Sequence, residues 1–148
     1  MWSIFLWIIP HWIQRFEAWI HAPQFPFLTT VGWTVFAAAS CLGLWSAFTM
    51  AWFGEGTPLP LDTARKFVIE GPYRWIRNPM AVAGLMQGIG IGFTMGSYGV
   101  FVYCVVGGIL WQSFARPVEE ADLAARFGVE YERYRKRVHC WIPRIEHS

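Results

Sequence analysis

Charged residues are scarce in this sequence. Asp, Glu, Lys and Arg make up 15% of the 148 residues, whereas 55% are hydrophobic and 18% are aromatic. Soluble domains average about 25% charged residues, so the composition argues against an ordinary soluble protein and favours a membrane protein. The length suits one small integral membrane domain over residues 1–148.

Cysteine and histidine are also few, and neither has the spacing of a chemical site. The cysteines form no Cys-x-x-Cys pair and no even disulfide framework. The histidines are scattered, so we expect no metal ion. The N-terminus lacks a basic segment and a small-residue cleavage site, which argues against a removable signal peptide. The residues concerned are Cys41, Cys104, Cys140, His11, His21, His139 and His147.

Two long runs carry no formal charge. The first, Val31–Phe53, has 23 residues, and about 20 apolar residues suffice for one spanning helix. The second, Asn78–Ala115, has 38 residues and is interrupted near its middle by Thr94–Gly99. It therefore predicts a helical hairpin over residues 80–115, with one arm on either side of the interruption.

Helical patterns also occur at both ends. Residues 1–21 begin apolar and then become amphipathic, which predicts a helix that either spans the membrane or lies in its interface. Residues 117–138 have acidic side chains at the start and basic ones at the end, as a helix dipole favours, and Gly128 suggests a bend. The proline-rich residues 54–60 should not be helical.

The expected fold is thus an all-α integral membrane protein with three to four membrane helices, including the hairpin, and a cytoplasmic C-terminal amphipathic helix. Of the twelve basic residues, only Arg15 precedes residue 54. The others flank the hairpin on both sides, so they share one face of the membrane, and the positive-inside bias makes that face cytoplasmic. The mixed charges of the tail make nucleic acid a weaker explanation. We expect a bacterial inner-membrane protein.

The segment GPYRWIRNPM, residues 71–80, is unusually polar and aromatic for the start of a membrane helix. A second polar segment follows the hairpin, so the two should meet at the cytoplasmic surface beside lipid. Such a place suits a charged, water-soluble cofactor and a lipid-soluble substrate. The first segment offers Tyr73, Arg74, Arg77 and Asn78, and the second offers Arg116, Glu119, Glu120, Tyr131 and Tyr134.

The segment GPYRWIRNPM, an apolar hairpin and then EEADLAARFGVEYERYRKRVHCWIPR occur in this order. This arrangement resembles the isoprenylcysteine carboxyl methyltransferase and phospholipid methyltransferase superfamily, as a small bacterial-type member. The family pattern is Arg-His-Pro-x-Tyr, an apolar stretch, Glu-Glu, then Phe-Gly-x-Glu-Tyr-x-x-Tyr and Ile-Pro. The resemblance covers residues 54–144 and implies S-adenosylmethionine as cofactor, bound without a Rossmann domain.

The resemblance also implies roles for matching residues. Cofactor binding falls to Tyr73, Arg77, Asn78, Pro79, Met80, Glu120, Tyr131 and Tyr134. The residues expected to act in catalysis are Arg77 and Glu119, together with Arg116 from the polar segment after the hairpin. Asn78 stands where the family has histidine, and it cannot titrate near neutrality. Ala81 stands where the family has tyrosine, which removes a phenol from the pocket. We expect no catalytic role for His139 or Cys140.

The chemistry of the cofactor agrees with these roles. Its ammonium can pair with a buried carboxylate such as Glu120, and its carboxylate suits an arginine. Methyl transfer is an in-line displacement that depends on alignment. A carboxylate acceptor needs no base, whereas an amine acceptor would need one such as Glu119. The expected acceptor is amphiphilic or lipid-like.

Simpler explanations stand beside these roles. Arg74 and Arg77 would also suit lipid phosphates, the two glutamates a helix N-terminus, and the two tail tyrosines the membrane interface. Rival functions are an NADPH-dependent membrane reductase of related architecture and a non-enzymatic scaffold. A small-residue stripe favours close helix packing and predicts a homo-oligomer. The stripe is Gly84, Gly88, Gly92 and Gly96.

Overall fold

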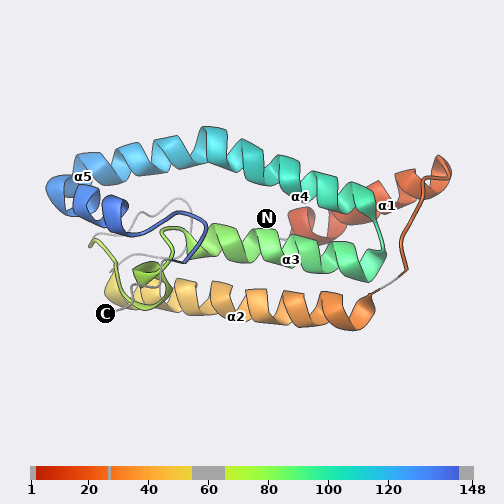
Figure 1. Ribbon diagram of the computed structural model, residues 1–148, viewed down its shortest axis with the longest axis horizontal. Helices are drawn as coiled ribbons and strands as arrows, with labels where there is room; N and C mark the ends of the chain where they lie inside the picture. The colour runs from red at the N-terminus through yellow and green to blue at the C-terminus, as the bar shows by residue number, and fades with distance from the viewer. Residues whose placement is uncertain (1–2, 27, 55–65, 144–148) are drawn as a thin grey trace. The chain divides into compact units, whose positions relative to one another are not determined.

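The computed structural model describes residues 3–26, 28–54 and 66–143 (Figure 1). Every regular element in these residues is a helix, so the predicted all-α class is confirmed. Residues 55–60 of the predicted proline-rich linker, and also Arg65 and Arg144, lie outside the described residues. The elements are η1 (Ile4–Ile8), α1 (Ile9–Trp19), α2 (Thr29–Phe53), η2 (Gly71–Arg74), α3 (Pro79–Met95), α4 (Tyr98–Leu110), η3 (Trp111–Ala115) and α5 (Arg116–Arg137).

Among the described residues, two helical stretches are long and apolar enough to cross a membrane. They are α2, with 25 residues, and the stretch Tyr98–Arg137, whereas α3 is a shorter apolar helix. The hydroxyl groups of α2 are satisfied inside the helix: Ser46 donates to the carbonyl of Leu42 and Thr49 to that of Trp45. A helix in lipid requires such internal pairing, because no water is there to replace it.

The predicted second arm of the hairpin and the predicted C-terminal helix are continuous. The α-helical turns of α4 widen into the π-helical segment η3, which leads directly into α5. Pro117 has no N–H and disturbs the turn before it. A π-helical turn accommodates such a disturbance without ending the helix, and η3 ends at Ala115, two residues before this proline.

The described residues divide into two compact units, and each is considered by itself. The first comprises those within Met1–Ser40 and Gly84–Gln112. Here the last turns of α3 and the whole of α4 run in opposite directions, joined by a turn in which Gly96 has a φ of 63° (Figure 1). Ser97 caps α4, since its hydroxyl oxygen accepts the N–H of Val100 at 3.1 Å.

The glycines of the predicted stripe make contacts within the chain. A Cβ at Gly88 would lie 2.6 Å from the Cys104 sulfur, and one at Gly92 would lie 3.3 Å from the Phe101 ring. These positions therefore permit close packing of α3 on α4. Homo-oligomerisation through the stripe stays a prediction.

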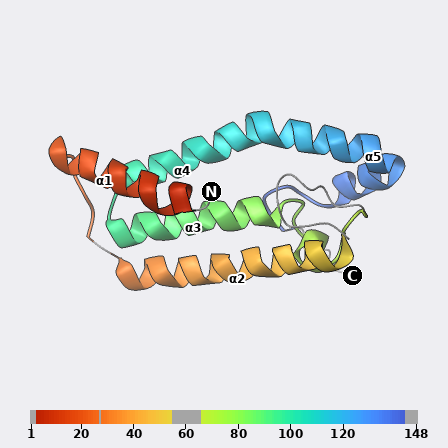
Figure 2. The ribbon, with the colours of Figure 1, turned by 180° about the vertical axis from the view of Figure 1, so that it is seen from behind.

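Helix α1 lies beside the start of α4 (Figure 2), and a buried carboxylate of α1 holds it there. Glu17 is 7% exposed, and it accepts the Ser97 hydroxyl at 2.5 Å and the Gly99 N–H at 2.6 Å. The unpaired N–H groups at a helix N-terminus favour an anion there. The aromatic side of α1 faces outward, with Trp19 76% exposed. The two alternatives for residues 1–21, a membrane span and an interfacial helix, both stay predictions.

The second unit comprises the described residues within Cys41–Ala83 and Ser113–Ser148. Gly71 has a φ of 54°, and a Cβ there would lie 2.6 Å from the Thr49 hydroxyl, so only glycine lets η2 approach α2 this closely. Trp75 also packs edge-on against Trp45, with ring centroids 6.1 Å apart. The start of α3 is thereby held against the end of α2.

Candidate active site

The GPYRWIRNPM segment positions its side chains through backbone hydrogen bonds. The N–H of Ile76 donates to the Pro72 carbonyl at 3.1 Å, which closes the turn after η2. The N–H of Arg77 donates to the carbonyl of His139 at 3.0 Å. The chain beyond α5 therefore fixes the backbone of Arg77, and the contribution of His139 is its carbonyl oxygen.

Asn78 joins the start of α3 to α5. Its side-chain oxygen accepts the N–H of Ala81 at 3.1 Å, which is an N-cap contact. Its side-chain nitrogen donates to a carboxylate oxygen of Glu119 at 3.1 Å. Pro79 follows as the buried first residue of α3, a position that proline favours. Met80 is half-buried and makes no polar contact with the other candidate residues in the described part of the chain.

Glu120 is the centre of a cluster of arginines. One of its oxygens accepts from Nη1 of Arg77 at 2.5 Å and from Nε of Arg116 at 2.9 Å. The other oxygen lies 3.7 Å from Nε of Arg135. The side chains of Arg77 and Glu120 are 12% and 17% exposed. Such a largely buried pair is costly to break, because either partner alone would be a desolvated charge.

One buried donor of this cluster has no partner. Among the residues that the structure describes, Nε of Arg77 is the single buried side-chain nitrogen or oxygen without a hydrogen bond. Buried polar groups are nearly always paired. Arg77 and Arg116 share one oxygen of Glu120, whereas Arg135 also lies 3.5 Å from a carboxylate oxygen of Glu132. The cluster thus has an unpaired donor to offer another anion, on a guanidinium that shares its carboxylate partner with Arg116.

Buried aromatic residues form the wall beside the cluster. The Tyr134 hydroxyl donates to the carbonyl of Tyr73 at 2.6 Å. Phe67 packs edge-on against Tyr131 and Tyr134, with centroids 5.8 and 5.2 Å away. Desolvation raises the pKa values of Tyr73, Tyr131 and Tyr134, and Arg77 partly offsets this for Tyr131 and Tyr134. All three phenols are therefore neutral donors near pH 7.

The two neighbouring glutamates differ in environment. Glu120 is surrounded by arginines, whereas Glu119 is more exposed and has one donor, the Asn78 amide. Partial desolvation raises the pKa of Glu119, the Asn78 hydrogen bond opposes this, and the negative charge of Glu120 adds to the rise. A carboxylate with a raised pKa and an unfilled oxygen suits proton transfer or the binding of a cation.

The structure brings together most of the residues that the sequence suggested, and it adds two. Arg77, Arg116 and Glu120 meet directly, as do Asn78 with Glu119 and Tyr73 with Tyr134. Arg135 and Phe67 were not expected. Arg135 lies four residues after Tyr131, and that helical spacing was the one available signal.

Two other chemical possibilities receive no support from the geometry. Burial raises the pKa of the Cys140 thiol, which leaves it in the less reactive protonated form. Among the described residues, no group of three or more His, Cys, Asp or Glu is placed to hold a metal ion.

Comparison with known proteins identifies the family. The family model of the phospholipid methyltransferases matches residues 25–130, which is more than half of the chain. The chain belongs to the phospholipid methyltransferase family. The match includes every candidate residue from Tyr73 to Glu120, and Tyr131 and Tyr134 follow just after it.

This phospholipid methyltransferase family member is also similar to the protein-S-isoprenylcysteine O-methyltransferase of Schizosaccharomyces pombe (strain 972 / ATCC 24843). The two are 33% identical over 81 residues, which cover 53% of this chain and 33% of the relative. The chain therefore spans about a third of the length of that relative. Both comparisons agree with the resemblance drawn from the sequence motifs.

Proposed function

We propose that this protein is an integral membrane methyltransferase that uses S-adenosylmethionine and binds it at the cluster around Arg77 and Glu120. Family membership supports the reaction class. The observation that carries the cofactor assignment is the buried, unpaired Nε of Arg77, whose guanidinium shares the Glu120 carboxylate with Arg116. An aminocarboxylate would supply the missing anion, and arginine binds a carboxylate with two parallel hydrogen bonds.

The residues present fit this cofactor, which supplies an electrophilic methyl group when bound. Arg77 would bind the carboxylate of the cofactor. The sequence motifs suggest Glu120 as the partner of its ammonium, but Glu120 already accepts hydrogen bonds from Arg77 and Arg116. We therefore propose that Glu120 positions Arg77 and Arg116, and that Glu119 faces the ammonium or the acceptor. The phenols of Tyr73, Tyr131 and Tyr134 would line the remaining space.

The proposed acceptor is amphiphilic and enters from the membrane. Two helical stretches are apolar and long enough to span a bilayer, so a lipid-soluble acceptor would reach the site by lateral diffusion. A carboxylate acceptor would need only alignment, whereas a protonated amine would need a base. Glu119, with its raised pKa, is the residue proposed for that step.

Equilibrium binding of S-adenosylmethionine to the detergent-purified protein tests the proposal. Glu120→Gln should weaken binding about tenfold or more, because Arg77 loses the charged partner that positions it. Asp122→Asn is the matched control, since it removes a carboxylate of the same helix whose partner is Arg126. NADPH should not compete. Thermal unfolding of each variant separates loss of binding from loss of fold.

Two results would overturn the proposal. One is the absence of saturable binding in a folded, lipid-reconstituted sample, which would favour a scaffold. The other is displacement of the bound cofactor by NADPH, which would favour a membrane reductase.

A further inference from the structure

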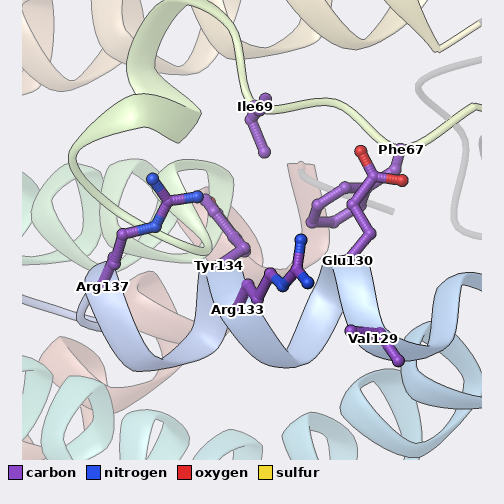
Figure 3. A pocket seen from close by; sticks show the side chains of 7 residues that line it. All are labelled: Phe67, Ile69, Val129, Glu130, Arg133, Tyr134 and Arg137. Atoms are coloured by element: carbon purple, nitrogen blue, oxygen red, sulfur yellow. The ribbon is translucent and has the colours of Figure 1, made fainter.

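A cavity of about 440 Å³ lies beside the last turns of α5 (Figure 3). Ligand pockets commonly have volumes of about 300–1,000 Å³, so this one can hold part of a small molecule. Phe67 and Ile69, which precede η2, form one side of the cavity, and α5 forms the other. Its lining residues are Phe67, Ile69, Val129, Glu130, Arg133, Tyr134 and Arg137.

Part of the lining is apolar and exposed. Ile69 is 38% exposed and Val129 is 67% exposed, and the aromatic rings of Phe67 and Tyr134 complete this surface. Exposed apolar side chains that line a cavity favour an apolar ligand group, because a ligand that buries them removes apolar surface from water.

The other part is cationic. Arg133 and Arg137 are one helical turn apart and rise from α5 on the side that faces Ile69 (Figure 3). Neither has an ion pair or side-chain hydrogen bond within residues 3–26, 28–54 and 66–143. Glu130 is the one acidic residue of the lining, so the rim keeps a net positive charge.

The helix dipole alone does not account for this arrangement. Basic residues in the last turn of a helix are favoured wherever they point, and Lys136 satisfies the dipole as well as its neighbours do. Arg133 and Arg137 differ from Lys136 because they line a cavity with an apolar wall. An apolar surface beside two unpaired guanidiniums is complementary to an anionic amphiphile.

We propose that this pocket binds the phosphate of an anionic membrane phospholipid as a bound lipid and not as the methyl acceptor. The guanidiniums of Arg133 and Arg137 would hold the phosphate, since arginine recognises phosphate with paired hydrogen bonds. Ile69 and Val129 would contact the lipid chain. Tyr134 lines the pocket and also belongs to the candidate active site. A lipid bound in the pocket would therefore restrict the motion of Tyr134 in that site.

Native mass spectrometry of the full chain in a neutral detergent tests this inference. The protein is titrated with phosphatidylglycerol or phosphatidylcholine, and bound lipid is counted. Phosphatidylglycerol should bind at least about tenfold more tightly than phosphatidylcholine, and the double variant Arg133→Gln/Arg137→Gln should lose that preference. Lys136→Gln, which removes a charge from the same turn but not from the pocket, should keep it.

A variant that binds lipid more tightly shows that the effects of substitution on lipid binding are not caused by misfolding. Glu130→Gln removes the acidic group of the rim and should tighten phosphatidylglycerol binding severalfold. Val129→Ser should weaken it, and soluble glycerol phosphate should compete poorly, if the apolar wall contributes.

Four outcomes would overturn the inference. They are equal retention of the two lipids, an unchanged preference in the double arginine variant, equal loss in Lys136→Gln, and full competition by glycerol phosphate. The last would indicate a site for soluble phosphate. None of these measurements depends on methyl transfer, so failure here is distinguishable from failure of the proposed function.

Discussion

Asn78 has two separable contacts, and each serves a different element. Its oxygen caps α3 through the N–H of Ala81, and its nitrogen orients Glu119 on α5. In the family pattern that the sequence motifs resemble, histidine stands at this position. An asparagine amide donates and accepts at all pH values near neutrality, so both contacts should persist across the physiological range.

Two substitutions at Asn78 should separate these contacts. Asn78→Ser keeps an N-cap oxygen but is too short to reach Glu119, so stability should change by only a few tenths of a kcal/mol, whereas Asn78→Ala should cost about 1 kcal/mol. Both should lower kcat/KM for methyl transfer, because Glu119 loses its donor. Thermal unfolding and initial rates measure the two effects. Full activity in Asn78→Ser would contradict a positioning role.

The raised pKa of Glu119 gives a pH dependence of known sign. The folded protein holds the Glu119 proton more tightly than the unfolded chain, whose glutamates titrate near pH 4.3, so the folded state binds more protons in that window. The contribution of Glu119 to stability should therefore fall as pH rises from about 4 through its folded-state pKa. Glu119→Gln should lack this contribution and its loss.

Melting temperatures in detergent between pH 4 and pH 7 provide the measurement. The difference between Glu119→Gln and the unsubstituted protein should shift in favour of the variant as pH rises. Asp122→Asn serves as the control, because Asp122 contacts Arg126 and not Asn78. Parallel curves for Glu119→Gln and the unsubstituted protein would show that Glu119 is not perturbed by folding.

At the scale of helices, glycine decides where backbones approach one another. In the first unit, a Cβ on Gly90 would lie 2.8 Å from the Gly32 carbonyl oxygen and 2.9 Å from the Phe36 nitrogen. These neighbours are backbone atoms, which cannot move aside as a flexible side chain can. A Cβ on Gly107, in contrast, would have no heavy atom within 4 Å.

Alanine at these two glycines should therefore have opposite effects. Gly90→Ala should destabilise the protein by about 1–3 kcal/mol through overpacking. Gly107→Ala should be neutral or stabilise it by up to about 1 kcal/mol through higher helix propensity. Thermal unfolding in one detergent compares the pair. A similar loss in both variants would point to a general intolerance of side chains in these helices.

The helices were largely predictable because strong local signals mark them. The absence of charged residues delimited α2. Gly96 and Ser97 marked the turn between α3 and α4, and Gly128 marked the bend in α5. Gly128 has φ 51° and ψ −124°, which are not helical values. The long-range pairs were not predictable in the same way: Arg77 and Glu120 are 43 residues apart, and no periodicity specifies such a contact.

The bend in α5 also explains why Arg135 was missed. Helical periodicity assigns faces only while the backbone stays helical, and Gly128 interrupts it. Residues beyond Gly128 therefore point in directions that helical periodicity from Glu120 does not give, so the sequence alone did not distinguish Arg135 from its basic neighbours. The contact of Glu17 with Ser97 and Gly99 was also not predictable from the sequence. Only the fold places the Glu17 carboxylate beside the start of α4, where it accepts hydrogen bonds from these two residues.

At the scale of the whole molecule, the distribution of charge predicts an orientation in the membrane. The 25 residues of α2 extend about 37 Å at a rise of 1.5 Å per residue, enough to cross a hydrocarbon core of about 30 Å. If α2 spans, its two flanks lie on opposite sides. Eleven of the twelve basic residues follow α2, so the positive-inside bias places residues after α2, with the candidate site, in the cytoplasm.

Thiol labelling of intact bacterial cells measures this orientation. In a background with Cys41, Cys104 and Cys140 replaced by alanine, Lys136→Cys should react with a membrane-impermeant maleimide only after the cells are permeabilised. His21→Cys, before α2, should react in intact cells, because both side chains are exposed in the structure and only the membrane distinguishes them. Reaction of Lys136→Cys in intact cells would place the candidate site outside the cytoplasm. The proposed use of S-adenosylmethionine would then fail as well, because the bilayer would separate a charged cytoplasmic cofactor from the residues proposed to bind it.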